Sequence, residues 1–363
     1  MRGRSVIGEA VRNVTGGTTR ALSAALVFVV LVGGLAVADA RVLVAVWQKA
    51  DAFRSAGAAV TTLVSESGPV VDGSRCAALV GAGGLTGSAA LRPGEPVRAA
   101  NLPDSDLTVW EATPGLVAVL ARVAHPVSRL SSDDESGVWV ADDLAATLGA
   151  RAGDGILLAD GRTMQVAGVY SWPDDGRDRV LSYAVVVPVA AAGSFERCWA
   201  EAWPADSEAA GLLYSVAAPG AEDVQVGRLN ATLGSELDVA AEIATRPTAP
   251  APLVAVAVGL VLGFLLVRTR RLELASALHA GVAKPFLAWQ IVLETGAWLL
   301  AAVLVGAAAT GVASLMGNPE PFVGTWLAAV STVVVGAAAV LLGTAVGALA
   351  VKEVHLFRYF KDR

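Results

Sequence analysis

The chain has 363 residues, of which 55% are hydrophobic and 17% charged, and its formal net charge is −6. A mean hydropathy of +0.59 is high for a soluble globular protein, so the composition favours a membrane protein. We expect no nucleic-acid partner for this acidic chain.

Four runs of the sequence are apolar and long enough to cross a bilayer as helices. A hydrocarbon core is about 30 Å thick, which a helix of about 17–25 apolar residues spans. In the second run, Pro252 can stand only in the first helical turn, where a missing N–H costs no hydrogen bond. The runs are Ala21–Val46, Pro250–Val267, Ile291–Met316 and Thr325–Val351.

The predicted fold is a membrane protein with four transmembrane α-helices and a mixed α/β extracytoplasmic domain inserted between helices 1 and 2. The N-terminal part is assigned as a cytoplasmic amphipathic helix at 1–20, helix 1 with a stalk at 21–47 and the extracytoplasmic domain at 48–249. The remaining boundaries are 250–267 for helix 2, 268–290 for a cytoplasmic segment, 291–316 for helix 3, 317–324 for an extracellular loop, 325–351 for helix 4 and 352–363 for a cytoplasmic tail.

Basic residues gather in three groups that fall on one side of the membrane if all four helices span it. Short loops rich in Lys and Arg stay in the cytoplasm, so both termini are predicted inside and the large domain outside. The loop 317–324 carries Glu320 and no basic residue, which suits the outer face. The basic residues are Arg2, Arg4, Arg12 and Arg20, then Arg268, Arg270, Arg271 and Lys284, then Lys352, Arg358, Lys361 and Arg363.

A cleaved signal peptide that ends near Ala38-Asp39-Ala40 is the alternative interpretation of the N-terminus. Two observations weigh against it. The apolar stretch continues past Ala40 as far as Trp47, and cleavage would leave an odd number of helices with one basic group on the wrong side.

The sequence of residues 48–249 predicts alternating helices and strands. Thr113-Pro114 supplies an N-cap and a proline at the first helical position for a helix through Val123. A second helix is expected over Ala141–Leu148, where Gly149 would end it.

Asp160-Gly161 is the strongest hairpin signal in the chain, between predicted strands Gly155–Ala159 and Thr163–Tyr170. Three prolines make Thr245–Pro252 a stiff connector into helix 2. Further strands are predicted at Asp106–Trp110, Gly137–Val140, Tyr183–Val187 and Leu212–Val216, and a further helix at Val224–Leu233.

The chain has two cysteines, Cys76 and Cys198, and both lie in the predicted outer domain. A pair confined to an oxidising compartment favours a disulfide, which would close a loop of about 120 residues. Two buried free thiols, which behave as small hydrophobes, remain the alternative.

The sequence contains no nucleotide-binding, metalloprotease, redox or serine-hydrolase motif of the kinds G-x-x-x-x-G-K-[ST], H-E-x-x-H, C-x-x-C and G-x-S-x-G. We therefore predict no catalytic residue and no metal site, and a protein that is not an enzyme. The acidic run Asp133-Asp134-Glu135 is better explained as a solvated loop than as a calcium site.

The interiors of the predicted membrane helices carry almost no charge. Asp39 lies near the outer end of helix 1 and Glu294 near the inner end of helix 3. Ion-coupled transporters usually place ionisable groups near the midplane, so the pattern favours an external source of energy. Gly259-x-x-x-Gly263 and Gly343-x-x-x-Gly347 would allow helices to approach closely.

Between helices 2 and 3, Arg271 and Glu273 open a short segment rich in Leu and Ala, Gly281 follows it, and Glu294 stands just inside helix 3. This arrangement resembles the cytoplasmic signature of FtsX/MacB-type ABC permeases, in which a basic residue and a Glu open a short helix, a Gly ends the helix, and a second Glu stands just inside the next membrane helix. Glu273, Gly281 and Glu294 match that signature in identity and spacing. Only Lys284 remains of the basic residues that usually follow the glycine, and Pro285 is added.

Two regions of the outer domain, Val138–Gly149 and Gly153–Tyr170, look like the strand, helix and hairpin of the extracytoplasmic domain of MacB-like permeases. Glu9–Asn13 resembles the amphipathic helix that opens these chains. The resemblance covers most of the chain in layout, and its specific part is the stretch from Glu273 to Glu294.

The resemblance implies a permease subunit whose ATPase is a separate polypeptide, and a coupling helix that docks its apolar face in a groove of that ATPase. An interfacial helix lying on lipid is the alternative. The implied partners are a dimer of ABC ATPase subunits, a second copy or a related permease, and the lipid bilayer; ATP and Mg would be bound by the ATPase, with no cofactor in this chain. The candidate coupling residues are Arg270, Arg271, Glu273, Leu274, Ala277, Leu278 and Gly281.

In this family, closure of the ATPase pair moves the membrane helices and the outer domain. The expected function is therefore to move a peptide, lipid or antibiotic-like substrate by motion of the outer domain. The alternative is an FtsX-like transducer, which activates a cell-wall hydrolase and transports nothing.

Overall fold

The computed structural model describes residues 21–66, 68–124, 126–129, 137–203, 208–221, 223–234 and 236–352. The predicted N-terminal helix, the acidic run 133–135 and all but the first residue of the predicted tail lie outside these ranges. The chain divides into two compact units, one formed by Met1–Gln48 with Ala240–Arg363 and the other by Lys49–Val239.

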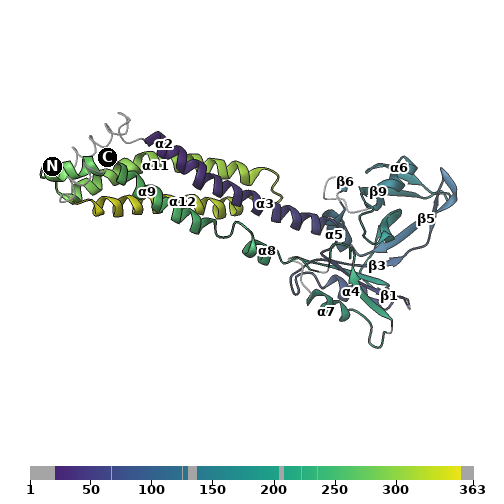
Figure 1. The fold of residues 1–363 in the computed structure, drawn as a ribbon. Coiled ribbons are helices and arrows are strands. Elements are labelled where there is room, and N and C mark those ends of the chain that lie inside the picture. The colour runs from purple at the N-terminus through teal and green to yellow at the C-terminus, as the bar shows by residue number, and fades with distance from the viewer. Residues whose placement is uncertain are drawn as a thin grey trace. The chain divides into compact units, whose positions relative to one another are not determined.

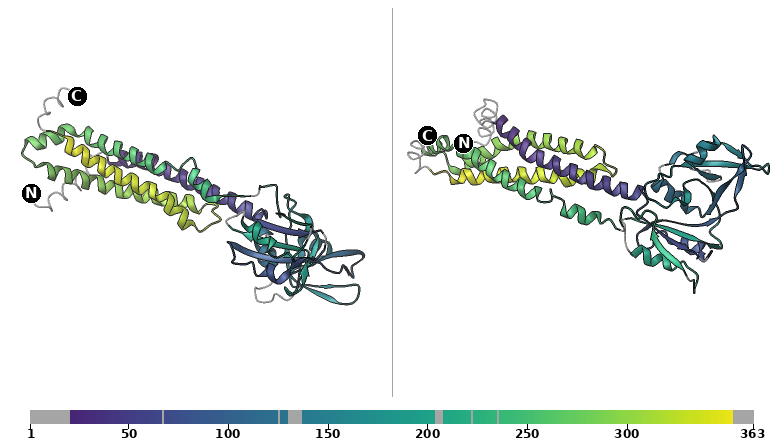
Figure 2. Two further views of the ribbon diagram at one scale, coloured as in Figure 1. Left: turned by 90° about the horizontal axis from the view of Figure 1, so that it is seen from below. Right: turned by 45° about the vertical axis from the view of Figure 1, so that its right-hand side comes forward.

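The first unit is a bundle of apolar helices that lie side by side (Figures 1 and 2). Among the described residues, four helical stretches are long and apolar enough to cross a membrane, which fits a multi-pass membrane protein. They are Ala21–Ser55, Ala251–Thr269, Lys284–Leu315 and Phe322–Ala350. The elements are α2 (Ala21–Phe28), a π-helical turn η1 (Val29–Gly33), α3 (Gly34–Ser55), α9 (Ala251–Thr269), α11 (Lys284–Leu315) and α12 (Phe322–Ala350), with the short helices α8 (Val239–Thr245) and α10 (Arg271–His279).

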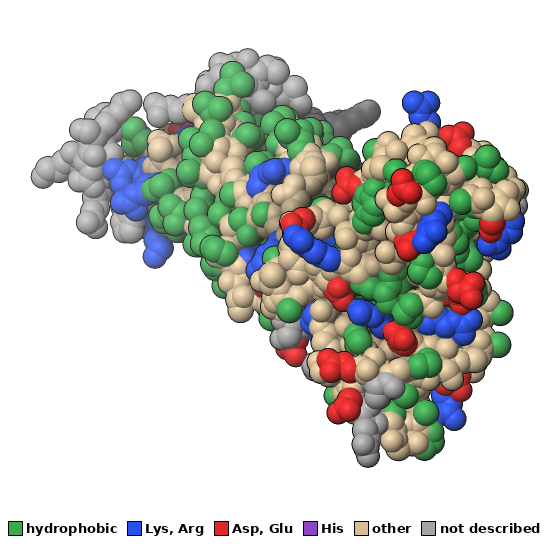
Figure 3. Space-filling model, turned by 90° about the vertical axis from the view of Figure 1, so that its right-hand side faces the viewer, with side chains coloured by type: hydrophobic (Ala, Val, Ile, Leu, Met, Phe, Trp, Pro, Cys, Tyr) green, Lys and Arg blue, Asp and Glu red, His purple; other side chains and the backbone are tan. Residues whose placement is uncertain are grey.

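Each of the four predicted spans coincides with one of these stretches. The first helix continues past Trp47 to Ser55, and α11 begins at Lys284 rather than at Ile291. Large apolar side chains such as Leu304, Leu327 and Leu265 are exposed on the bundle surface, as a face in contact with lipid requires. Figure 3 shows hydrophobic side chains over the visible part of the helices, whereas both signs of charge are mixed on the α/β unit.

Glycines let α9 and α12 pack backbone against backbone. A Cβ atom on Gly263 would lie 2.1 Å from the carbonyl oxygen of Val340, and one on Gly343 would lie 2.3 Å from that of Leu260. Both Gly-x-x-x-Gly pairs of the sequence therefore act within the chain, where they bring two of its own helices together.

Polar contacts tie α3 to its neighbours at the end of the bundle near Gly317. The buried Asp39 accepts from Arg246 Nε at 2.8 Å, which holds the connector before α9. Arg41 Nη1 donates to the carbonyl oxygen of Met316 at 2.6 Å, and Gln48 Nε2 donates to that of Gly317 at 2.7 Å. The last two bonds satisfy carbonyl groups in the turn directly after α11.

The second unit is built on one large mixed sheet. Its strand order is β13-β1-β12-β3-β5-β10-β7-β9-β6, with β4 paired to β5 and β8 to β9, and β11 pairs with β2 separately. The strands are β1 (Val60–Ser65), β2 (Val71–Asp72), β3 (Leu85–Pro93), β4 (Val97–Ala99), β5 (Leu102–Ala112), β6 (Pro126–Arg129), β7 (Val138–Ala141), β8 (Gly155–Leu157), β9 (Thr163–Tyr170), β10 (Ala184–Pro188), β11 (Ser194–Phe195), β12 (Arg197–Ala202) and β13 (Val224–Arg228). The helices are α4 (Gly73–Ala77), α5 (Gly115–Val123), α6 (Asp142–Leu148), a 3₁₀ turn η2 (Arg179–Leu181) and α7 (Glu208–Tyr214).

Six of these strands close into a ring, in the order β5, β10, β7, β9, β8 and β4. The closing seam is short: the amide of Ala100 donates to Leu157 O, and the amide of Ala159 donates to Arg98 O, both at 2.8 Å. The seam joins β4 to β8, which would otherwise stand at two edges of the sheet.

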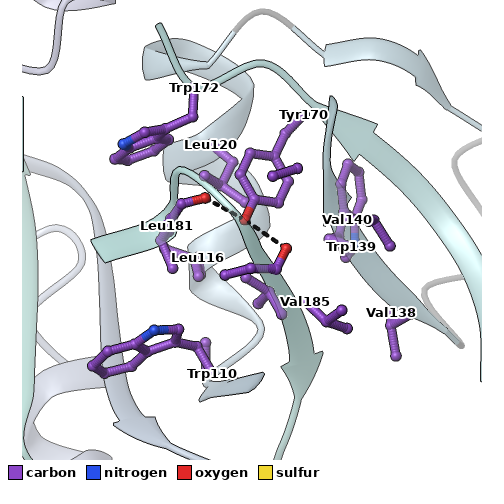
Figure 4. Packing of buried hydrophobic residues seen from close by; sticks show 14 of the residues in the cluster. Trp110, Leu116, Leu120, Val138, Trp139, Val140, Tyr170, Trp172, Leu181 and Val185 are labelled. Carbon is purple, nitrogen blue, oxygen red and sulfur yellow. Dashed lines mark hydrogen bonds between the residues drawn. The ribbon is translucent and has the colours of Figure 1, made fainter. Parts of the chain in front are cut away.

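The main core gathers side chains of α5 and of strands β5, β7, β9 and β10, part of which Figure 4 shows. The hydroxyl of the fully buried Tyr170 lies 2.9 Å from Leu181 O and 3.2 Å from Ala184 O, to which it can donate. Burial raises the pKa of this hydroxyl, so it stays protonated as a donor. Trp172 stacks on Trp199 with ring centroids 6.1 Å apart.

The two cysteines form a disulfide that joins α4 to β12. Cys198 and Trp199 are neighbours on β12, so their side chains point to opposite faces of the sheet. Trp199 enters the main core, whereas Cys198 enters a second core with Cys76, Leu63 and Phe195. The predicted disulfide is confirmed, and both sulfur-bearing residues are fully buried.

Three local predictions for the α/β unit were wrong. The segment Leu212–Val216 falls mostly in helix α7 rather than in a strand, and Val224–Leu233 begins with strand β13 rather than a helix. Val224, Gln225 and Val226 alternate apolar and polar, a period that suits pairing with β1. Thr113 does not cap α5 with its side chain; its hydroxyl accepts the amide of Ala90 at 3.0 Å.

Replacement of Gly263 by Ala is expected to lower the free energy of unfolding by about 1–3 kcal/mol, because the new methyl group forces α9 away from α12. Gly296 of α11 is the matched control, since a Cβ there meets nothing within 4 Å. Gly296→Ala should leave stability unchanged or raise it by up to about 1 kcal/mol, because alanine is favoured over glycine inside a helix. Denaturant unfolding of the two variants in detergent micelles measures the difference, and equal stabilities would contradict the backbone contact.

Candidate functional site

The candidate coupling segment folds as the short helix α10 between two membrane-length helices. Its end is set by Gly281, whose φ of +88° suits a glycine. The amide of Gly281 donates to Leu278 O at 3.0 Å, and the amide of Val282 donates to Ala277 O at 3.1 Å. This pair of bonds is the Schellman arrangement, so Gly281 ends the helix as the sequence predicted.

The apolar face of α10 packs on the chain's own membrane helices. Leu274 is 5% exposed and Ala275 is fully buried, in a cluster with Val267, Ile291 and Val351. Leu278 is partly buried against the same cluster, whereas Ala277 is of intermediate exposure.

The sequence interpretation placed this apolar face in a groove of a partner protein. In the structure Leu274 is already covered by the ends of α9, α11 and α12, so the surface that α10 presents outward is the polar one. Glu273, Ser276 and His279 lie on that exposed surface.

Arg270 connects three helices at this point. It stands between α9 and α10, and its Nη2 and Nε donate to the two carboxylate oxygens of Glu273 at 2.7 and 3.0 Å. Its Nη1 donates to Glu294 Oε2 of α11 at 2.5 Å. A planar guanidinium with five donors can serve two carboxylates at once, which a lysine could not do with the same geometry.

The two carboxylates that Arg270 binds differ in exposure. The Glu294 side chain is 2% exposed, and Gln290 Nε2 also donates to it at 3.1 Å. The Glu273 side chain is 58% exposed. Removing one partner of the buried pair, Arg270 and Glu294, would therefore leave an unpaired charge away from water.

The charges of the exposed pair stabilise each other. The hydrogen bond to Glu273 raises the pKa of Arg270, and the same bond lowers the pKa of Glu273. The pKa of Glu273 is lower in the folded chain than in the unfolded chain. Its contribution to folding stability is therefore fully present at a pH above the ordinary glutamate pKa, and it is lost as the pH falls through the lowered pKa.

A cavity of about 20 Å³ lies beside this cluster, lined by Arg270, Glu294, Leu274, Trp298 and neighbouring residues. Its size suits a single water molecule, and the charged side chains supply polar partners for one. Lys284 Nζ donates to Leu349 O at 3.2 Å, so the start of α11 also satisfies a carbonyl near the end of α12.

The structure brings some of the predicted coupling residues together and adds Glu294 to them. Arg270, Glu273 and Leu274 belong to one cluster, Arg271 is of intermediate exposure, and Cys76 and Cys198 lie in the other unit. Glu294 was singled out as a match of the signature but not as a site residue. The 24-residue separation of Arg270 and Glu294 gave no sign that they pair.

Replacement of Glu294 by Gln should lower the free energy of unfolding by about 2–4 kcal/mol, because it leaves a largely buried Arg270 with one anionic partner fewer. Glu273→Gln is the matched control, and its exposed pair should be worth less than about 1 kcal/mol. Denaturant unfolding in detergent micelles compares the two variants. Equal losses would show that burial does not distinguish the pairs.

No protein-family model matches this chain, and no curated protein matches it. Among solved structures, the periplasmic region of MacB from Actinobacillus actinomycetemcomitans is similar with a TM-score of 0.37 and 13% identity, over 48% of this chain and 91% of that one. The extracellular domain of the ABC-type transporter YknZ from Gram-positive bacteria is similar with a TM-score of 0.32 and 15% identity, over 46% of this chain and 99% of that one.

Proposed function

We propose that this chain is the permease subunit of an ABC transporter, which couples ATP hydrolysis by a separate ATPase to motion of the α/β unit. The observation that carries the proposal is the seating of α10. One face of this helix is fixed to the ends of three membrane-length helices, and the opposite face is polar and exposed.

A helix as short as α10 is marginal in water by itself, so its stability must come from packing. Leu274 and Ala275 supply the packing, and Arg270 adds charged hydrogen bonds to α11. A partner that binds the exposed face and moves would therefore move the ends of α9, α11 and α12 with it. In this proposal Glu273 and Ser276 contact the ATPase, and Leu274 and Leu278 pass the displacement to the membrane helices.

The proposed orientation follows from the basic groups. With Arg268, Arg270, Arg271 and Lys284 in the cytoplasm, α10 lies where ATP is available. The α/β unit then lies outside, in a compartment where the Cys76–Cys198 disulfide can persist.

The proposed assembly contains a dimer of ATPase subunits, which bind ATP and Mg, and a second permease copy or a related permease. The proposed substrate class is a peptide, lipid or antibiotic-like molecule that the α/β unit moves. This chain would supply binding and force transmission and no catalytic group.

The exposed face of α10 provides the test of partner binding. Glu273→Lys combined with Ser276→Arg should reduce the amount of cognate ATPase that co-purifies by at least tenfold, because reversing a charge at an interface costs about 2–5 kcal/mol. ATP turnover of the purified complex in nanodiscs should fall in parallel. Thr163→Lys, an exposed change in the hairpin of the α/β unit, is the control and should leave both unchanged.

Full binding and turnover in the double variant would rule out α10 as the coupling helix. Loss of both in the Thr163→Lys control would show that the effect is not specific to α10.

Thiol labelling tests the orientation. The two native cysteines are joined to each other, so a single introduced cysteine provides the reactive thiol. A cysteine at the exposed position Thr163 should react with a membrane-impermeant reagent in intact cells, and one at Ser276 should react only after the membrane is permeabilised. The reverse pattern would overturn the proposed orientation.

A further inference from the structure

The end of α3 inside the α/β unit is fully closed by hydrogen bonds. The amide of Gly57 donates to Arg54 O at 3.0 Å and that of Ala58 to Phe53 O at 3.1 Å, the Schellman arrangement, with Gly57 at φ +80°. Such bonds satisfy two of the carbonyl groups that a helix leaves open at its end. Side chains from distant parts of the unit take the next two.

Arg177 and Asn230 supply those side chains. Arg177 Nη2 donates to Ser55 O, and Asn230 Nδ2 donates to Ala56 O, each at 3.1 Å. Both side chains are buried, and Asp175 holds Arg177 in place with a second Nη2 bond of 2.6 Å. The loop after β9 and the segment after β13 therefore both hydrogen-bond to the end of α3.

Arg54, in the last turn of α3, forms an ion pair with Glu201. Its Nε donates to Glu201 Oε1 of β12 at 2.6 Å, and its guanidinium lies over the ring of Trp203, 5.2 Å from the centroid. Glu201 is fully buried, and its other oxygen, Oε2, accepts from Arg122 of α5 and from Thr86 Oγ1. The carboxylate therefore stands between α3 on one side and α5 on the other.

We propose that Arg54 is the positioning residue that fastens α3 to the α/β unit through the buried carboxylate of Glu201. We call this contact between Arg54 and Glu201 the joint. Its role in coupling rests on the proposed function, in which a displacement of α3 would be transmitted to the sheet through β12.

The position of Glu201 suits such a joint. If Arg54 moved away, water could not easily replace it beside the buried carboxylate of Glu201. Separation of the pair would therefore cost free energy. Strand β12 is paired on both sides, to β1 and to β3, and the disulfide at Cys198 joins it to α4. A displacement applied at Glu201 would therefore be shared by several elements of the unit.

Arg122 provides a matched control for Arg54. Both arginines bind Glu201, and their side chains are similarly exposed, 26% for Arg54 and 32% for Arg122. Each single change to Gln removes one cation from the same buried carboxylate. Only Arg54→Gln removes the contact between α3 and that carboxylate.

Hydrogen exchange of the full chain in nanodiscs, without any ATPase, measures the joint. In Arg54→Gln the amides of residues 56–58 should exchange at least tenfold faster than in the wild type, whereas Arg122→Gln should change them by less than threefold. If Arg54→Gln does not fold, Arg54→Lys, which keeps the charge and loses the planar fork, supplies the measurement and should show faster exchange in the same amides. Equal exchange in the Arg54 and Arg122 variants would overturn the joint.

A second arm adds the cognate ATPase and compares exchange in β12 with ATP and vanadate against the nucleotide-free state. The wild type and Arg122→Gln should show a nucleotide-dependent change in β12, and Arg54→Gln should lose it. If exchange in β12 of the wild type does not change with nucleotide, the proposed function is refuted. The measurement without ATPase still tests whether Arg54 holds the end of α3. A change that persists in Arg54→Gln would refute the route through Arg54.

Discussion

The structure around α10 depends on one buried charge, the carboxylate of Glu294 in α11. A carboxylate that is 2% exposed must be paired, and the cation that reaches it is Arg270, at the junction of α9 and α10. This requirement fixes where α9 ends relative to α11. It also brings Glu273 into the first turn of α10, where an acidic side chain is favoured by the helix dipole. The apolar contacts of Leu274 and Ala275 add the packing that a helix as short as α10 needs.

The same device recurs in the α/β unit. There the buried carboxylate is Glu201, and the arginine that reaches it from a helix end is Arg54. In both places a helix terminus is fixed by a charged hydrogen bond to a group that has little access to water, which makes the attachment directional and costly to break. Within the helical bundle, α9 and α12 pack through small residues, as at Gly263 and Gly343, which let the two backbones approach closely.

Features governed by local chemistry could be predicted from the sequence. Helix lengths follow from the apolar runs, Gly281 and Gly149 end helices because of their backbone freedom, and Asp160-Gly161 marks its hairpin. Long-range features could not be predicted: Arg54 and Glu201 are 147 residues apart, and nothing local signals their contact. The apolar face of α10 shows the same limit, because a pattern reveals that a face will be covered but not whether the cover is a partner or the chain itself. Strand β13 was mistaken for a helix because its period of two extends over so few residues.

The central claim is that α10 faces a partner with its polar side while its apolar side rests on the membrane helices. Photo-crosslinking from adjacent positions of this helix tests it most directly, with a photoreactive amino acid at Ser276, which is exposed, or at Ala275, which is fully buried. In membranes that contain the cognate ATPase, the account predicts crosslinks to the ATPase from position 276 and crosslinks only within the chain from position 275. Crosslinks to the ATPase from position 275 and none from position 276 would contradict it.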